Sequence, residues 1–313
     1  MAEPPLRLAC IGECMIELTA RDARTLDLRF GGDTLNTAVY AARRLRQAGR
    51  FAQVDYVTAL GDDPYSDWMV QSWADEGVGT GTVLRLPGRL PGLYMIRTDD
   101  RGERTFHYWR SAAAARDLLR APRMADIARD LRAYDMIYLS GITLSIFDAE
   151  SRAMLFDLLD DVRRVGALVA FDANFRPRGW PDVEEARKTM AAAWRRTDIG
   201  LPTFGDEQML FGDADPDATI ARLQMLGVRE VVVKRDRAPC VIDRAGMRWE
   251  IPAESVAKPV DTTAAGDSFN GAYLSARLCD ALPADAAHAG HRVAAAVIQH
   301  PGAIIPLAAM PAT

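Results

Sequence analysis

The chain has 313 residues with a net charge of −5, and 49% of its residues are hydrophobic, so it can bury a substantial core. Its lysines and arginines are scattered along an acidic chain, which argues against nucleic acid as a main partner. The first residues lack a signal-peptide pattern and no window reaches the roughly 18 apolar residues of a spanning helix, so we predict a cytoplasmic protein without membrane association.

Short apolar runs alternate with longer helical patterns along the chain. This rhythm is typical of parallel strands joined by helices, so we predict an α/β fold whose mostly parallel sheet is covered on both faces. The expected strands are 6–12, 54–60, 135–140, 167–171, 198–202 and 230–234, and the expected helices are 34–48, 64–77, 148–165, 182–196, 215–226, 267–279 and 283–300.

The cysteines and histidines show no metal-binding pattern. Cys10 and Cys14 fall in what we expect to be one strand, where four residues span about 13 Å, too far for a disulfide or a shared metal ion. His288 and His291 lie three residues apart on a predicted helix. Together with Asp285 they drift around that helix, which favours a solvated surface.

The run FGGDTLN at 30–36 opens the first predicted helix. Asp33 or Thr34 can cap this helix with its side chain, and the paired glycines allow the backbone to approach another group closely. Asn36 then projects from the first turn. A tight turn before a capped helix explains the same residues without a ligand.

Residues 82–111 do not follow this alternation of strands and helices. GLYMIRT and RTFHYWR are strand-like, and DDRGE between them is typical of a hairpin turn. Because side chains alternate along a strand, Phe106, Tyr108 and Arg110 share one face. The hairpin is either solvated or a small lid whose inner face contacts a substrate.

The stretch FDANFRPRGW at 171–180 ends a predicted buried strand with polar side chains. Ligands of open parallel sheets bind beyond the carboxyl ends of the strands, which is where Asp172, Asn174 and Arg176 would lie. Arg178 follows a proline and is expected to be solvated.

The stretch DTTAAGDSF at 261–269 places only small side chains directly before a carboxylate. The backbone N–H groups of Ala265, Gly266 and Asp267 can hold an anion while the Asp267 side chain accepts a proton. Ordinary helix-start chemistry accounts for the same residues equally well.

These three motifs, in this order and with an inserted hairpin, resemble the ribokinase-like (PfkB) family of carbohydrate kinases. Within it, GECMIEL, YVTALGDDPYSDWM and YLSGITLSIF are similar to the kinases of the sugar acid 2-keto-3-deoxygluconate. The resemblance implies a ribokinase-like three-layer α/β/α sandwich with a small β-sheet lid. It would be one domain over residues 1–313, with lid segments inserted at about 13–33 and 82–111. It also implies ATP with Mg²⁺ as phosphate source, transfer to a sugar hydroxyl, and a homo-oligomer, because lids of this family often pack across subunits.

The resemblance also assigns roles to single residues. Asp267 would accept the proton of the attacking hydroxyl, and the N–H groups of Ala265, Gly266 and Asp267 would stabilise the charge on the transferred phosphoryl group. Glu207 would help to hold Mg²⁺ through water. The implied sugar contacts are Gly32, Asn36, Tyr94, Tyr108, Arg110, Asn174 and Arg176, and the implied nucleotide contacts are Lys234, Ala264, Ala265 and Gly266.

The chain departs from the family pattern in two places. Phe204 stands where the Asn-x-x-Glu motif of the family has its asparagine, and Asp236 and Pro239 stand where the loop after Lys234 has glycines. The resemblance therefore says least about how the chain binds Mg²⁺ and which nucleotide base it prefers.

The residue types favour an acidic substrate. A desolvated arginine without a partner is costly, whereas the carboxylate of a sugar acid can bind Arg110 and Arg176 through two parallel hydrogen bonds. Two alternatives remain open: a fructokinase or ribokinase acting on a neutral sugar, and a non-catalytic sugar-acid sensor of the same fold.

Overall fold

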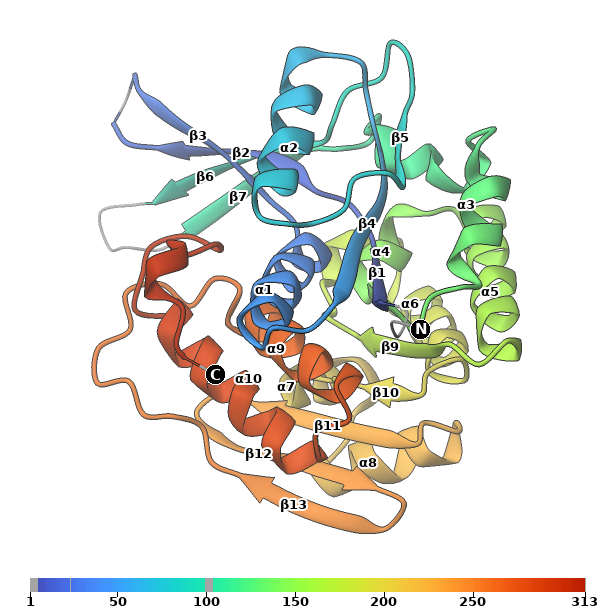
Figure 1. Ribbon diagram of the computed structural model, residues 1–313, viewed down its shortest axis with the longest axis vertical. Helices are drawn as coiled ribbons and strands as arrows, with labels where there is room; N and C mark the ends of the chain where they lie inside the picture. Colours follow the sequence, from blue (N-terminus) through green and yellow to red (C-terminus); the bar gives the residue numbers. More distant parts are fainter. Residues whose placement is uncertain (1–4, 23, 99–103, 313) are drawn as a thin grey trace.

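The fold is that of a computed structural model, which describes residues 5–22, 24–98 and 104–312. Among these residues nine strands form one sheet, in the order β13-β12-β11-β10-β9-β8-β1-β4-β5 (Figure 1). All neighbouring pairs from β5 to β11 are parallel, and β12 and β13 add an antiparallel edge. The strands are β1 (Leu6–Ile11), β4 (Ala52–Leu60), β5 (Val83–Arg85), β8 (Met136–Ser140), β9 (Leu168–Asp172), β10 (Ile199–Gly200), β11 (Glu230–Arg235), β12 (Ala238–Arg244) and β13 (Met247–Ile251).

Helices cover both faces of this sheet, because alternate strand residues point to opposite sides and both sets are apolar. In β1, Leu8 and Cys10 join the hydrophobic cluster on one face, whereas Ala9 and Ile11 join the cluster on the other. The first face carries α1 (Asp33–Gln47), α2 (Pro64–Asp75), α9 (Ala265–Leu278) and α10 (Pro283–Val297). The second carries α3 (Met124–Leu131), α4 (Gly141–Ile146), α5 (Ala149–Arg164), α6 (Val183–Trp194), α7 (Phe204–Phe211) and α8 (Pro216–Met225).

A second sheet of four strands projects beside the main body, in the order β3-β2-β6-β7 (Figure 1). Its strands are β2 (Met15–Ala20), β3 (Leu26–Gly31), β6 (Leu93–Thr98) and β7 (Arg104–Trp109), and we call it the lid sheet. β3 leads directly into α1, and β6 pairs with β7 in the predicted antiparallel manner. The predicted turn DDRGE lies outside the described residues.

The structure confirms the α/β class and the predicted parallel sheet, and it corrects several local predictions. β1 ends at Ile11, so Cys10 and Cys14 do not share a strand. His291 is buried and not solvated: its Nε2 lies 3.3 Å from Cys240 Sγ, and its ring packs edge-on against Phe269. The helices α3, α4 and α7 were not predicted.

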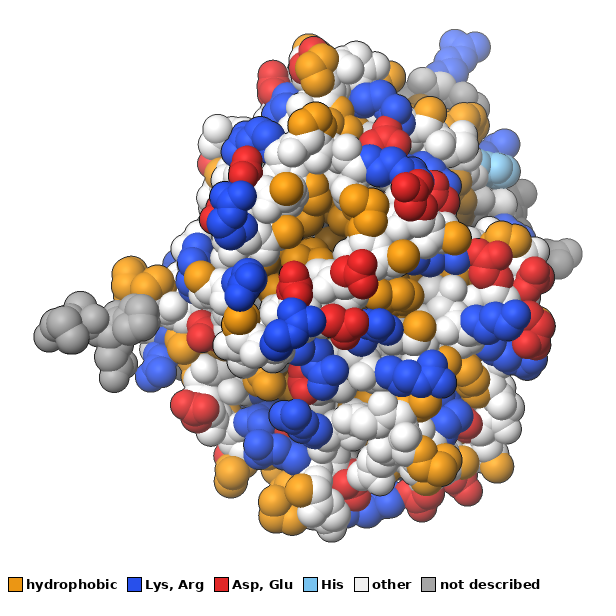
Figure 2. All heavy atoms as spheres, turned by 90° about the vertical axis from the view of Figure 1, so that its right-hand side faces the viewer, with side chains coloured by type: hydrophobic (Ala, Val, Ile, Leu, Met, Phe, Trp, Pro, Cys, Tyr) orange, Lys and Arg blue, Asp and Glu red, His pale blue; other side chains and the backbone are white. Residues whose placement is uncertain are grey.

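In the described part of the chain, no helix is both long and apolar enough to cross a bilayer. On the face shown in Figure 2, basic and acidic side chains are interspersed around a hollow bordered by hydrophobic side chains.

Candidate functional site

Two charged side chains and one amide, from three elements, meet at the carboxyl edge of the main sheet. Asp172 ends β9, Lys234 lies near the end of β11, and Asn270 lies in α9. Lys234 Nζ lies 2.5 Å from Asp172 Oδ2 and donates to Asn270 Oδ1 at 3.1 Å, while Asn270 Nδ2 donates to Asp172 Oδ2 at 2.7 Å. All three residues are buried. This network fixes the start of α9 against the edge of the sheet.

The start of α9 exposes unpaired backbone donors. Ala264 precedes the helix in the left-handed region (φ 60°), and no side chain caps this end. The N–H of Ala265 donates to Thr262 O at 3.3 Å, whereas those of Gly266 and Asp267 donate to no described residue. Because Gly266 has no side chain, the space next to these donors is open as far as Lys234 Nζ, 3.6 Å from where a Cβ would stand. Two free N–H groups beside an ammonium group suit an anion.

Asp267 is a partly buried carboxyl group in the first turn of α9. Its Oδ2 accepts from Asn36 Nδ2 at 2.8 Å, and Thr37 Oγ1 donates to its backbone carbonyl at 3.2 Å. Burial raises the pKa of Asp267 to about 7, and the carboxylates of Asp33 and Asp172 act in the same direction. A carboxylate with this pKa can accept a proton efficiently near neutral pH.

The structure gives Asp33 a different role from the predicted helix cap. α1 begins at Asp33 itself, after Gly32, and no side chain caps its N-terminus. Instead Asp33 Oδ2 accepts from Asn174 Nδ2 at 2.7 Å. Burial raises the pKa of Asp33 above its ordinary value, although the hydrogen bond from Asn174 acts against this. Asn174 itself is in the left-handed region (φ 36°). Sequence reasoning missed Asp33 as a site residue because capping already explained it.

Gly32 and Tyr94, two of the predicted sugar contacts, are closely packed against other residues of the chain. A Cβ at Gly32 would collide with the backbone of Glu13 and Cys14, so this glycine lets the start of α1 cross the segment after β1. The Tyr94 hydroxyl donates to Glu17, and its ring packs 5.9 Å from that of Tyr108.

Arg110, which we expected to lack an acidic partner in the protein, has one. It forms an ion pair with Glu13, whose side chain is 1% exposed. Burial raises the pKa of Glu13 above its ordinary value, with Arg110 acting in the opposite direction. Arg110 Nε is buried and has no hydrogen-bond partner among the described residues, so one donor is still free.

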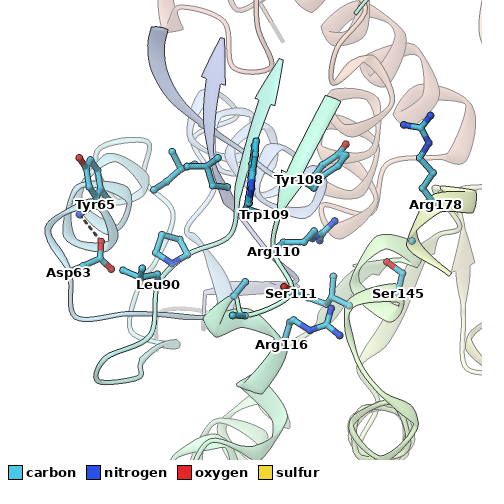
Figure 3. Close-up of a pocket in the computed structure, with 17 residues that line it drawn as sticks. Asp63, Tyr65, Leu90, Tyr108, Trp109, Arg110, Ser111, Arg116, Ser145 and Arg178 are labelled. Atoms are coloured by element: carbon cyan, nitrogen blue, oxygen red, sulfur yellow. Dashed lines mark hydrogen bonds between the residues drawn. The ribbon is translucent and has the colours of Figure 1, made fainter. Parts of the chain in front are cut away.

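Arg176 lies elsewhere and is 59% exposed. Its Nη1 donates to Phe175 O at 2.8 Å and lies 3.6 Å from Asp206 Oδ2. Arg176 does not line the cavity of about 740 Å³ beside the lid sheet, which Arg110 does line (Figure 3). The structure therefore does not bring these two arginines to one cavity.

Comparisons with known proteins agree with this architecture. A family described as "pfkB family carbohydrate kinase" matches residues 6–310. The chain belongs to this family. It is 49% identical to a 2-dehydro-3-deoxygluconokinase of Dickeya dadantii, over 97% of this chain and 98% of the relative, and 46% identical to one of Escherichia coli K12, over 98% and 99%. The fold is similar to that of a fructokinase with bound ATP from Xylella fastidiosa, with a TM-score of 0.80 at 26% identity, covering 97% of this chain and 95% of that one.

In this pfkB-family kinase, the predicted metal residue Glu207 points into the core. It is fully buried, and Arg222 Nη2 lies 2.6 Å from its Oε2. Burial raises the pKa of Glu207 to about 8, and Arg222 opposes this rise.

The preceding residue, Asp206, faces the candidate site of the pfkB-family kinase. Its Oδ2 accepts from Phe175 N at 3.1 Å, and its other oxygen accepts no hydrogen bond from a described residue. Burial raises the pKa of Asp206, Arg176 lowers it, and Asp172 raises it, so Asp206 lies within electrostatic range of the Asp172–Lys234 pair. Sequence reasoning missed Asp206 because α7 was not predicted.

The stretch after Lys234 is a tight hairpin and not an open loop. Arg235 pairs with Ala238 across the turn, and Asp236 adopts φ 49°. Arg235 Nε donates to Pro239 O at 2.6 Å. Lys234 itself points away from this hairpin: in this pfkB-family kinase its side chain contacts Asp172 and Asn270 at the start of α9.

Proposed function

We propose that this chain transfers the γ-phosphoryl group of ATP to the 6-hydroxyl of 2-dehydro-3-deoxygluconate, also called 2-keto-3-deoxygluconate. The observation that carries the proposal is the arrangement of Asp267, a partly buried carboxyl group with a pKa of about 7, beside Lys234 and two N–H groups that donate to no described residue. Relatives of 39–49% identity that are named 2-dehydro-3-deoxygluconokinase support the substrate.

Asp267 takes the proton of the attacking sugar hydroxyl in this proposal, and the hydrogen bond from Asn36 holds its carboxylate in place. Asn36 Oδ1 is buried without a hydrogen-bond partner among the described residues, so it can accept from a sugar hydroxyl. The N–H groups of Gly266 and Asp267, with Lys234 Nζ, stabilise negative charge on the group being transferred. Asp33, which acts on the pKa of Asp267, and its partner Asn174 bind further sugar hydroxyls in this proposal.

The residues present fit ATP with Mg²⁺. N–H donors at a helix start suit phosphate oxygens, and the Asp206 oxygen that accepts from no described residue suits a hard cation or its water. We therefore propose Asp206, and not Glu207, as the acidic residue on the metal side. When bound, MgATP supplies the phosphoryl group and neutralises part of its charge.

One observation favours the neutral-sugar alternative. Glu13 already neutralises Arg110, so Arg110 alone does not require an acidic substrate. A substrate panel with MgATP separates the candidates: 2-dehydro-3-deoxygluconate, fructose and ribose, followed by ADP release and by the mass of the product. We expect the acid to be phosphorylated with the highest kcat/KM. Preference for fructose or ribose would replace the proposal with the neutral-sugar function, and binding of the acid without turnover would favour the sensor.

The variant Gly266→Val tests the anion site. A branched side chain should cover the free N–H groups and abolish phosphoryl transfer, whereas the fold should persist because a Cβ here makes only an ordinary contact with Lys234. Turnover and the melting temperature are measured together. As a control, Gly81→Val adds the same side chain where an added Cβ meets nothing within 4 Å. An active Gly266→Val enzyme, or one that loses activity only because it unfolds, would contradict the anion site.

A further inference from the structure

The cavity of about 740 Å³ beside the lid sheet contains more positive charge than Arg110 supplies. It is also lined by Arg116 and Arg178, and a second cavity of about 500 Å³ shares these two arginines and Ser145. Arg116 comes from a short helical turn, η1 (Ala114–Arg120), that follows the lid strand β7. In Figure 3, Arg110 and Arg116 extend into the cavity toward the side where Ser145 lies.

The charges at the end of this cavity that holds Arg110 do not cancel. The acidic residue that lines the cavity, Asp63, caps α2 and lies beside Tyr65, away from Arg110 and Arg116 (Figure 3). Arg110 and Glu13 form an ion pair and so have no net charge between them. Arg116 is partly buried and forms no ion pair or hydrogen bond through its side chain with a described residue, yet it lies close enough to Glu13 to lower the pKa of that carboxyl group. Two arginines therefore face one carboxylate, and one positive charge remains free for a ligand.

Arg178 is a weaker candidate for the same role. It is exposed, and in Figure 3 its guanidinium group is directed away from Arg110 and Arg116. A side chain in this position remains hydrated, and a hydrated ion pair contributes little binding free energy.

The cavity also reaches the lid strand that carries predicted sugar contacts, because Tyr108 and Arg110 both line it. Asp33 acts on the pKa of both Asp267 and Glu13, so it lies within electrostatic range of each. In a six-carbon sugar acid the 6-hydroxyl and the carboxylate are at opposite ends. When the hydroxyl is at Asp267, the carboxylate must be bound away from Asp267, and the arginines that line the cavity are the groups that suit it.

We infer that Arg116 binds the carboxylate of the sugar acid, next to Arg110, and is the residue that makes this pocket select acids over neutral sugars. The inference rests on the proposed function. Without Arg116, a bound carboxylate would gain no net attraction from the Arg110–Glu13 pair, because Glu13 repels it while Arg110 attracts it. With Arg116, the three side chains carry a net charge of +1 and can hold one carboxylate. A neutral sugar gains almost nothing from this charge.

The test compares two substrates that differ only at the first carbon. 3-Deoxyfructose has a hydroxymethyl group where 2-dehydro-3-deoxygluconate has its carboxylate. In Arg116→Gln the KM for the acid should rise roughly 10- to 100-fold, as expected for loss of a hydrogen bond to a charged group, with kcat little changed. The KM for 3-deoxyfructose should stay within about twofold of wild type. Arg116→Lys should recover part of the acid binding, because it retains the charge but not the planar fork.

The matched control is Arg123→Gln, which removes the same charge from an exposed arginine before α3 and should change neither KM. An equal rise of both KM values in Arg116→Gln would overturn the inference, as would an acid-specific loss in Arg178→Gln with none in Arg116→Gln. Calorimetric titration of the acid into wild type and Arg116→Gln gives a readout that does not depend on turnover. Weakened binding there supports the inference even if the wild type fails to phosphorylate the acid, which would refute only the proposed function.

Discussion

Replacing Asp267 by asparagine should lower kcat by about 10² to 10⁴-fold and leave the KM for the sugar acid within a few-fold of wild type. The amide has nearly the same shape but cannot accept the proton of the attacking hydroxyl. Initial rates at saturating MgATP measure this effect. Turnover above about a tenth of wild type would show that Asp267 is not the base.

The same variant should not be less stable than wild type. Burial raises the pKa of Asp267 to about 7, above the value of about 4 in an unfolded chain, so the folded protein retains this proton more strongly. Stability from this group is therefore lost as the pH rises from about 4 to about 7, and the neutral amide avoids that loss. At pH 8 the melting temperature of the variant should equal or exceed that of wild type. A marked fall would indicate a structural role.

Replacing Lys234 by methionine should have the second large effect, on both stability and rate. The change leaves Asp172 buried without its counter-ion, and breaking such a pair lowers the free energy of unfolding by about 3–5 kcal/mol. It also removes a positive charge next to the free N–H groups of α9, which should lower kcat by at least about 100-fold. Chemical denaturation and initial rates measure the two effects.

A second substitution separates these two effects of Lys234→Met. Adding Asp172→Asn should restore most of the stability, because no uncompensated buried charge remains, but it should not restore the rate. Lys188→Met, at an exposed position of α6, is the matched control and should change neither quantity. If the double variant regained activity along with stability, Lys234 would be a structural residue only.

The sequence patterns predicted those parts of the site that depend on neighbouring residues. The small residues before Asp267 indicate an exposed helix start, and the structure places free N–H groups there. The polar residues after β9 are predicted in the same way, because strand ends share one edge of a parallel sheet. Both inferences use local spacing and a general property of α/β folds.

Contacts between distant parts of the chain were not predictable in this way. Arg110 and Glu13 are 97 residues apart, and only the folded lid sheet brings them together, so the sequence alone made Arg110 look unpaired. The choice between Asp206 and Glu207 depends on where α7 begins, because adjacent residues on a helix point in directions about 100° apart. The burial of His291 depends on β12, an antiparallel strand between β11 and β13 that was not predicted.

The pH dependence of kcat/KM for 2-dehydro-3-deoxygluconate, at saturating MgATP, tests the role of Asp267 most directly. Because the ionised form is the base, kcat/KM for wild type should rise about tenfold per pH unit below pH 7 and level off above it, following the pKa of about 7. The residual activity of Asp267→Asn should show no such rise, which separates the enzyme group from ionisation of the nucleotide. A flat wild-type profile between about pH 5.5 and 8, or the same rise in the Asp267→Asn variant, would contradict Asp267 as the general base.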